Sequence, residues 1–294
     1  MKKNTIVITG GAGFVGTNLI NLLLKKTKFK IISIDNYSSG TKKNHINNKR
    51  IKYIKGSTSN IFEILKKPSL INSIFHFGEF ARIYQSFINM NECINSNSIG
   101  TNFVFNYCLK NRIKLIYSAT SATLGNKGND KNLSPYSFTK SKNLELLENL
   151  KKWFKFRYEV IYFYNVYGPC QISKGKMATV IGIFENAFRN KKPLTIVKPG
   201  TQTRRFTHIY DTVDICYLAW KKNLCRHYSI SNRNSYSIND VAKMFDCKIL
   251  YLKERPGERY ASALTNMNLS NKVYKYFGQI QLNEYIKKFI KKIN

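Results

Sequence analysis

Tyr136 and Lys140 are the residues whose types and spacing most directly indicate catalysis. They lie four positions apart in a Tyr-x-x-x-Lys pattern, so on a helix both side chains would project from one face. A nearby ammonium group favours the phenolate form of a tyrosine by lowering the phenol pKa. Thr120 ends an apolar segment 16 residues upstream, where its hydroxyl could share the proton of a substrate. These three residues are candidates for acid and base catalysis on a substrate hydroxyl.

A glycine-rich turn near the start of the chain is suited to holding phosphate groups. Gly10, Gly13 and Gly16 follow an apolar segment and open a segment of helical periodicity. Glycine permits a sharp turn and a close approach of the backbone, and the N–H groups at a helix N-terminus bind phosphate. Asp35 ends the next apolar segment, where a carboxylate can accept hydrogen bonds from a ribose. Because Asp35 would repel a 2′-phosphate, the pattern predicts NAD as the cofactor and disfavours NADP.

The elements that must position these residues alternate in a regular way. Short apolar segments alternate with longer segments of helical periodicity through the first half of the chain, which indicates repeated βαβ units. The predicted fold class is therefore α/β, a Rossmann-type doubly wound parallel sheet. Strands are predicted at 5–9, 30–35, 51–55, 73–77, 114–118, 159–163 and 194–197, and helices at 14–26, 97–111, 136–154, 237–245 and 283–292.

The regular alternation ends after about residue 165. Residues 1–165, together with about 206–225, are predicted to form the cofactor-binding Rossmann domain. Residues 166–205 and 226–294 are predicted to form a smaller α/β substrate-binding domain at the carboxyl edge of the sheet, where open α/β sheets bind ligands.

Composition narrows the class of protein further. The 294 residues are 43% hydrophobic and 14% aromatic, which excludes an intrinsically disordered chain. The formal net charge is +33, but the lysines are spread along the chain, so we expect anionic small molecules as partners and no nucleic acid. No apolar run approaches the roughly 20 residues of a membrane helix, and no signal peptide is evident, so a cytoplasmic location without membrane association is expected. Six dispersed cysteines without a Cys-x-x-Cys pair predict neither a disulfide framework nor a metal site.

Several ordered motifs resemble those of the extended short-chain dehydrogenase/reductases. Within that family the sequence is most similar to the UDP-glucose 4-epimerase-like, NAD-dependent epimerase/dehydratase enzymes, and the resemblance runs over nearly the whole chain. Besides the glycine turn with Asp35-Asn36, the similar segments are 75–78, 97–101, 118–125, 164–169, 200–206 and 255–258.

The resemblance implies specific roles for residues of these motifs. A nucleotide-diphosphate sugar would be the substrate, with Asn165, Arg204 and Arg255 at its diphosphate, Glu258 at its nucleoside ribose and Ser262 as a small gate beside its sugar. Homodimer formation is also implied. Tyr136, Lys140 and Thr120 would be catalytic, and the last of these would also touch the substrate. The implied cofactor contacts are Gly10, Gly13, Phe14, Val15, Gly16, Asp35, Asn36, Ser57, Phe77, Gly78, Asn97, Ser118, Tyr136 and Lys140.

Some positions depart from the family pattern. Ser57 follows Gly56 where the family usually has an aspartate that recognises adenine. Glu79 and Phe80 replace small residues after the fourth predicted strand, and Arg82 follows close to the expected nicotinamide side. These changes alter the expected pocket and leave the identity of the sugar undetermined, while the set of Tyr136, Lys140 and Thr120 is intact.

The residues after Thr120 bear on the type of reaction. A 4,6-dehydratase of this family would be expected to carry Asp-Glu there, whereas this chain has Ser121-Ala122. The remaining set suffices for reversible oxidation of a sugar at C4, so the resemblance favours a 4-epimerase acting on a UDP-hexose or UDP-N-acetylhexosamine through a transient 4-keto intermediate. An oxidoreductase or dehydratase of the same family is the alternative. A non-catalytic NAD-binding or nucleic-acid-binding protein on this fold is a more distant alternative.

Overall fold

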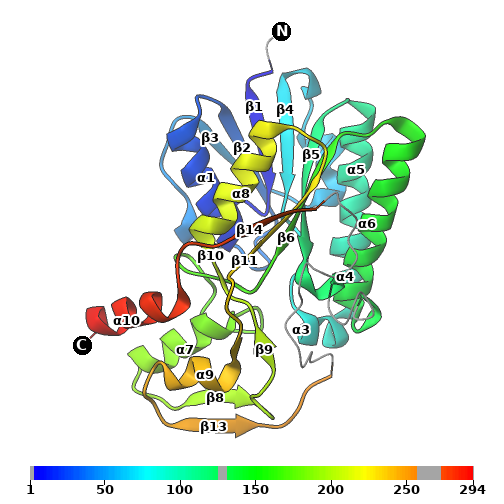
Figure 1. The fold of residues 1–294 in the computed structure, drawn as a ribbon. Helices are drawn as coiled ribbons and strands as arrows, with labels where there is room; N and C mark the ends of the chain where they lie inside the picture. Colours follow the sequence, from blue (N-terminus) through cyan, green and yellow to red (C-terminus); the bar gives the residue numbers. More distant parts are fainter. Residues whose placement is uncertain (1–2, 125–130, 257–272, 294) are drawn as a thin grey trace.

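A sheet of eight parallel strands forms the centre of the molecule. The computed structural model describes residues 3–124, 131–256 and 273–293. The strand order is β14-β11-β6-β5-β4-β1-β2-β3 (Figure 1). These strands are β1 (Thr5–Thr9), β2 (Lys30–Asp35), β3 (Ile51–Lys55), β4 (Ile71–His76), β5 (Lys114–Thr120), β6 (Tyr158–Phe163), β11 (His227–Ser231) and β14 (Val273–Phe277).

Helices cover both faces of this sheet. Alternate residues of a strand point to opposite faces, and β1 packs Ile6 and Ile8 on one side and Val7 on the other. Helices α1 (Phe14–Lys26) and α8 (Ile209–Lys222) pack on the first side. Helices α2 (Ile61–Ile64), α5 (Thr101–Lys110) and α6 (Pro135–Phe154) pack on the second. The predicted α/β fold with a doubly wound parallel sheet is therefore confirmed.

Smaller elements lie beyond the carboxyl edge of the sheet (Figure 1). They have a separate apolar core that includes Phe184, Phe245 and Ile286. The helices are α7 (Val180–Arg189), α9 (Ile238–Lys243) and α10 (Leu282–Ile293). The paired strands are β8 (Leu194–Val197) with β13 (Ile249–Leu252), β9 (Thr203–Arg204) with β12 (Tyr236–Ser237), and β7 (Val166–Tyr167) with β10 (Thr207–His208).

Short helices and helical turns lie in the connections between the strands. They are α3 (Ile83–Ile88), α4 (Met90–Ile94), the π-helical turn η4 (Asn95–Gly100) and the 3₁₀ turns η1 (Lys42–Asn44), η2 (Thr58–Asn60), η3 (Pro68–Leu70) and η5 (Ser121–Thr123). Across the three described ranges, no helix is both long and apolar enough to cross a lipid bilayer.

Two strands depart from the expected division of the chain. Both β11 and β14 lie within residues 226–294, yet they extend the large sheet beside β6. Residues 226–294 therefore do not belong as a whole to the smaller part, because the backbone of β6 offers an open edge that β11 pairs with. The predicted helix 97–111 is divided at Thr101 into η4 and α5.

Candidate active site

A cavity of about 310 Å³ lies at the carboxyl ends of the strands, where the strand order reverses between β1 and β4. Doubly wound sheets bind ligands at this point. The loops after β1, β2, β3 and β4, the end of β5 and the start of α6 contribute to its wall. Among the residues predicted to contact a cofactor, the wall contains Gly10, Gly13, Phe14, Val15, Gly16, Asp35, Asn36, Ser57, Phe77, Gly78, Ser118, Tyr136 and Lys140. The structure thus brings together segments from the first half of the chain.

The glycine turn after β1 forms a cradle that side chains would fill. Gly10 has a φ of +70°, and an added Cβ there would lie 2.9 Å from the backbone nitrogen of Gly78. A Cβ on Gly16 would lie 2.2 Å from the carbonyl oxygen of Gly10. No side chain among the described residues caps the N-terminus of α1, so its first N–H groups are left for a ligand. The cradle fits the pyrophosphate of a dinucleotide.

Alanine substitutions at two of these glycines should separate folding from ligand binding. Gly16→Ala should destabilise the protein by about 1–3 kcal/mol, because its methyl group meets backbone that cannot move aside. Gly13→Ala should cost less stability, since among the described residues its Cβ would contact only the Gly10 oxygen at 3.2 Å, yet it should weaken NAD binding by crowding the cradle. Thermal unfolding and NAD titration of both variants provide the measurement. Equal stability losses would contradict this description of the turn.

Asp35 connects the cradle to the end of β2. It is buried, and its Oδ2 accepts a hydrogen bond of 2.9 Å from the backbone N–H of Ala12, while Oδ1 accepts one of 2.8 Å from that of Tyr37. Each carboxylate oxygen can accept a further hydrogen bond, and Asp35 lines the cavity. Asp35 therefore fits an adenosine ribose with free hydroxyls, as in NAD. In NADP, the carboxylate of Asp35 would repel the 2′-phosphate.

The start of α6 fixes the position of Tyr136. Ser134 caps the helix by accepting a hydrogen bond of 3.1 Å from the N–H of Ser137, and Pro135 occupies the first helical position, where its missing N–H costs nothing. The backbone N–H of Tyr136 donates to the hydroxyl of Ser86 in α3 at 3.2 Å. Tyr136 and Lys140, one helical turn apart, both reach the cavity wall.

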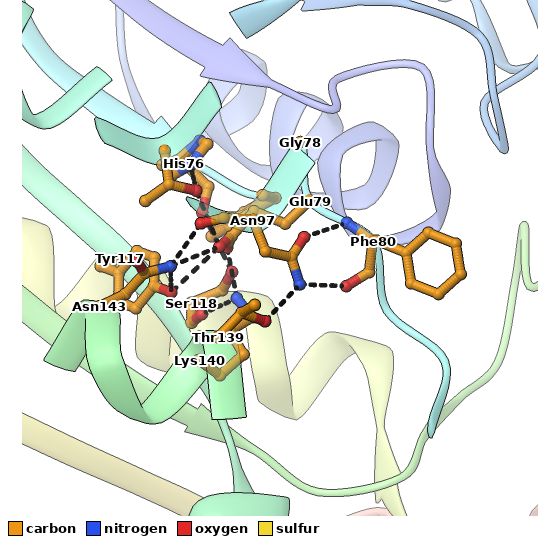
Figure 2. Close-up of polar contacts among 12 residues, drawn as sticks. His76, Gly78, Glu79, Phe80, Asn97, Tyr117, Ser118, Thr139, Lys140 and Asn143 are labelled. Carbon is orange, nitrogen blue, oxygen red and sulfur yellow. Dashed lines mark hydrogen bonds and ion pairs between the residues drawn. The ribbon is translucent and has the colours of Figure 1, made fainter. Parts of the chain in front are cut away.

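Lys140 is buried among polar groups of β4 and β5 (Figure 2). Its Nζ donates to the carbonyl oxygen of Ser118 at 2.6 Å and forms an ion pair with Oε2 of Glu79. It also lies 4.6 Å from the centre of the Tyr117 ring. Burial lowers the pKa of Lys140, and the carboxylate of Glu79 opposes that effect. Within the described part of the chain, these contacts use two of the three N–H donors of the ammonium group, which leaves one for the cavity.

Comparison with known proteins agrees with this geometry. Residues 6–231 match the NAD dependent epimerase/dehydratase family, a range that includes the glycine turn, Asp35, Tyr136 and Lys140. The chain belongs to this family. It is therefore an enzyme of the epimerase/dehydratase type, and the family to which it belongs is NAD-dependent.

Relatives within the epimerase/dehydratase family differ in the reaction they are named for. A dTDP-D-glucose 4,6-dehydratase of Dictyostelium discoideum is 27% identical over 81% of this chain, which spans 60% of the length of that protein. A putative UDP-glucose 4-epimerase of Methanocaldococcus jannaschii is 25% identical over 97% of each chain. The solved UDP-N-acetylglucosamine 4-epimerase of Methanobrevibacter ruminantium, in complex with UDP-N-acetylmuramic acid, is 25% identical with a TM-score of 0.84 and covers 99% of this chain and 98% of its own.

The cavity wall does not include Thr120 or Asn97, which the sequence predicted as a catalytic and a cofactor-binding residue. Thr120 ends β5, two residues after Ser118 and on the same side of the strand, and its Oγ1 accepts a hydrogen bond of 3.2 Å from the N–H of Ala122. Asn97 is completely buried, and its amide binds the backbone N–H and carbonyl of Phe80 at 2.6 and 3.0 Å. Asn97 therefore holds the loop after β4, and its contact with a cofactor stays a prediction.

The predicted diphosphate-binding residues come from the smaller elements, and those that are described do not line this cavity. Asn165 follows β6, and its Nδ2 donates to the carbonyl of Arg205 at 3.0 Å. Arg204 belongs to β9 and donates to the carbonyl of Thr203 at 2.8 Å. The guanidinium of Arg255 lies 4.8 Å from the ring centre of Tyr84 in α3. Glu258 and Ser262 lie outside the described residues.

Residues that the motifs did not predict complete the wall. Arg82 donates from Nε and Nη2 to the carbonyl of Met177 at 2.9 and 2.6 Å, which joins the segment after β7 to the loop after β4. Ile172 and Met177 line the cavity and also an adjoining one of about 380 Å³ that shares Glu79. Among these wall residues, only Glu79 and Arg82 gave a signal in the sequence, because they depart from the family pattern. The described parts of the chain contain no cluster of three or more His, Cys, Asp or Glu that could bind a metal.

Proposed function

We propose that the protein is an NAD-dependent nucleotide-sugar 4-epimerase, with a UDP-hexose or UDP-N-acetylhexosamine as substrate. The observation that carries the proposal is that Tyr136, Lys140 and the glycine cradle line one cavity. In addition, Ala122 packs beside Tyr136, where a dehydratase would carry a carboxylate. The epimerases of Methanocaldococcus jannaschii and Methanobrevibacter ruminantium, which match nearly the whole chain, support the same reaction.

The chain's own residues supply the proton transfers. Tyr136, as phenolate, takes the proton from the 4-hydroxyl of the sugar, and the hydroxyl of Thr120 shares a hydrogen bond with that oxygen. Lys140 stabilises the phenolate with its positive charge. NAD, when bound, supplies the hydride acceptor at C4 and then the hydride donor. Tyr136 returns its proton to the same oxygen after the 4-keto sugar has turned about its diphosphate linkage, so no proton is gained or lost overall.

Binding of the nucleotide diphosphate falls to residues of the smaller elements. Arg204 and Arg255 would pair with the phosphate oxygens, because guanidinium groups bind phosphate through charge-assisted hydrogen bonds. Asn165 would contact the same diphosphate, and Glu258 would accept a hydrogen bond from the nucleoside ribose. A small residue at Ser262 would leave room for an N-acetyl group.

A panel of UDP-, GDP-, CDP- and dTDP-sugars tests the proposed function. After incubation with the protein and NAD, product analysis by NMR and mass spectrometry should show the C4 epimer of a UDP-hexose or UDP-N-acetylhexosamine, with substrate and product of equal mass. A 4-keto-6-deoxy product would instead establish the dehydratase reaction, which the Dictyostelium discoideum relative favours. Accumulation of reduced cofactor in proportion to product would establish an oxidoreductase.

A further inference from the structure

Glu79 is a buried carboxylate that none of the catalytic roles above uses. Its side chain is 2% exposed, and it follows β4 in the loop that passes the cavity. Four side chains direct hydrogen-bond donors at it. Oε1 accepts from Thr101 and Tyr117 at 3.0 Å each and from Asn143 at 3.4 Å, while Oε2 pairs with Lys140 (Figure 2). Both oxygens of the carboxylate therefore have hydrogen-bond or ion-pair partners.

A chain of hydrogen bonds with one consistent direction leads to this carboxylate. The backbone N–H groups of residues 77–78 donate to Oγ1 of Thr9, whose hydroxyl is then free to donate to Nδ1 of His76 at 2.7 Å. Burial lowers the pKa of His76 to about 4, so its neutral ring carries one N–H. That N–H lies on Nε2 and donates to Oγ1 of Thr101 at 2.9 Å, and Thr101 donates to Glu79. The core of the sheet thus holds Glu79 in place.

The ion pair matters for Lys140 because burial alone opposes its charged form. The Lys140 side chain is 4% exposed, and burial lowers its pKa, whereas the Coulombic attraction and hydrogen bond from Glu79 raise it. Two anchors, the Glu79 carboxylate and the Ser118 carbonyl, also fix the direction of the remaining N–H donor. A lysine has a flexible four-carbon stem, so without these anchors its ammonium would not be held toward the cavity.

We propose that Glu79 is a positioning residue, whose carboxylate keeps Lys140 protonated and aims its free N–H at the cofactor cavity and Tyr136. This inference rests on the proposed roles of Lys140 and Tyr136. Glu79 makes no contact with substrate in the proposal, and acts through Lys140 alone.

Other titratable groups face the ion pair of Glu79 and Lys140. They are His76 from β4, Tyr117 from β5, Cys93 and Glu92 from α4, Tyr136 from α6, and Arg82, which faces Tyr136. His76 stays neutral above about pH 4, burial raises the pKa of Cys93 to about 11, and burial together with Glu79 raises that of Tyr117 well above its usual range. Between about pH 6 and about pH 9, none of these three changes charge, so a titration of the Glu79 variant in that window reports on Lys140 or Tyr136.

Glu79→Gln removes the charge and keeps the shape of the side chain. Lys140 should then lose its proton at lower pH, so NAD affinity should fall between about pH 6 and about pH 9 in the variant while it stays nearly constant in the parent. At about pH 8, turnover of the sugar substrate should fall by about tenfold or more with its KM changed by less than about threefold. Glu79→Asp, which keeps the charge, should restore part of the turnover. Glu145→Gln, which breaks the exposed Lys142–Glu145 pair of the same helix, is the matched control and should change neither property.

A double-mutant cycle separates the proposal from a structural role. If Glu79 acts through Lys140, Glu79→Gln should have no further effect on NAD affinity or turnover in a Lys140→Met background. Additive losses in the double variant, or a pH dependence of NAD affinity equal to that of the parent, would overturn the proposal. NAD titration needs no sugar, so it remains decisive if no sugar in the panel is turned over, an outcome that would count against the proposed function alone. Thermal unfolding of Glu79→Asp and Glu79→Gln identifies any variant that fails to fold. If Glu79→Gln does not fold, Glu79→Asp is tested instead: because it keeps the charge, its NAD affinity should stay nearly constant with pH, and a fall between about pH 6 and about pH 9 would overturn the proposal.

Discussion

Replacing Tyr136 with phenylalanine should lower turnover by roughly two or more orders of magnitude. The substitution removes one hydroxyl and keeps the ring, which packs against Phe80 and Ala122, so the fold and the cavity should be retained. Without the phenol, no group at this position can take the proton of the sugar hydroxyl. Steady-state kinetics with the substrate found in the panel, together with titration of NAD and of the nucleotide sugar, provide the measurement.

The Tyr136→Phe result needs a control for loss of a tyrosine hydroxyl in general. Tyr274 lies on the edge strand β14 with its side chain partly exposed, so Tyr274→Phe should retain turnover within about twofold. NAD and substrate affinities of Tyr136→Phe should stay within a few fold of the parent. Turnover of Tyr136→Phe close to that of the parent would exclude this residue as the acid and base.

Replacing Asp35 with alanine should weaken NAD binding by about tenfold or more, because hydrogen bonds to a charged group are lost at both the ribose and the cradle. The N–H groups of Ala12 and Tyr37 would lose their acceptor, so the glycine turn would be held less firmly. NADP binding should weaken less, since repulsion of its 2′-phosphate is also removed. The preference for NAD over NADP should therefore decrease.

Titration of both cofactors against the parent and the variant measures that preference. Asp214→Ala removes an exposed carboxylate from α8 and should leave both affinities unchanged. Equal affinity of the parent for NAD and NADP would contradict the role given to Asp35.

The features that the sequence predicted best are those that depend on residues close together along the chain. The boundaries of α1 agree at both ends, because the glycine turn starts the helix and its apolar periodicity continues without interruption to Lys26. The β strands from β1 to β6 were predicted because each is a short apolar run. In contrast, β11 alternates polar and apolar residues over only five positions, and β14 has Lys275 at its centre. They become strands because β11 pairs with the edge of β6 and β14 pairs with β11.

The same distinction applies to the candidate site. The cradle, Asp35, Tyr136 and Lys140 were predicted because their spacing along the chain carries the signal. The ion pair of Glu79 with Lys140 could not be predicted, since the two residues are 61 positions apart and meet only when β4 and α6 pack together. The hydrogen bonds of the Asn97 amide to the backbone of Phe80 were likewise not predicted, because they depend on the path of the loop after β4.

The path of the hydrogen on C4 of the sugar tests the central claim most directly. A UDP-hexose or UDP-N-acetylhexosamine carrying deuterium at C4 should be converted to its C4 epimer with the deuterium still at C4, because the same hydride is returned to the carbon that lost it. NMR of the product locates the label, and mass spectrometry measures how much of it is retained. Deuterium found at C6 of the product, or lost from the sugar into reduced cofactor, would contradict the 4-epimerase account.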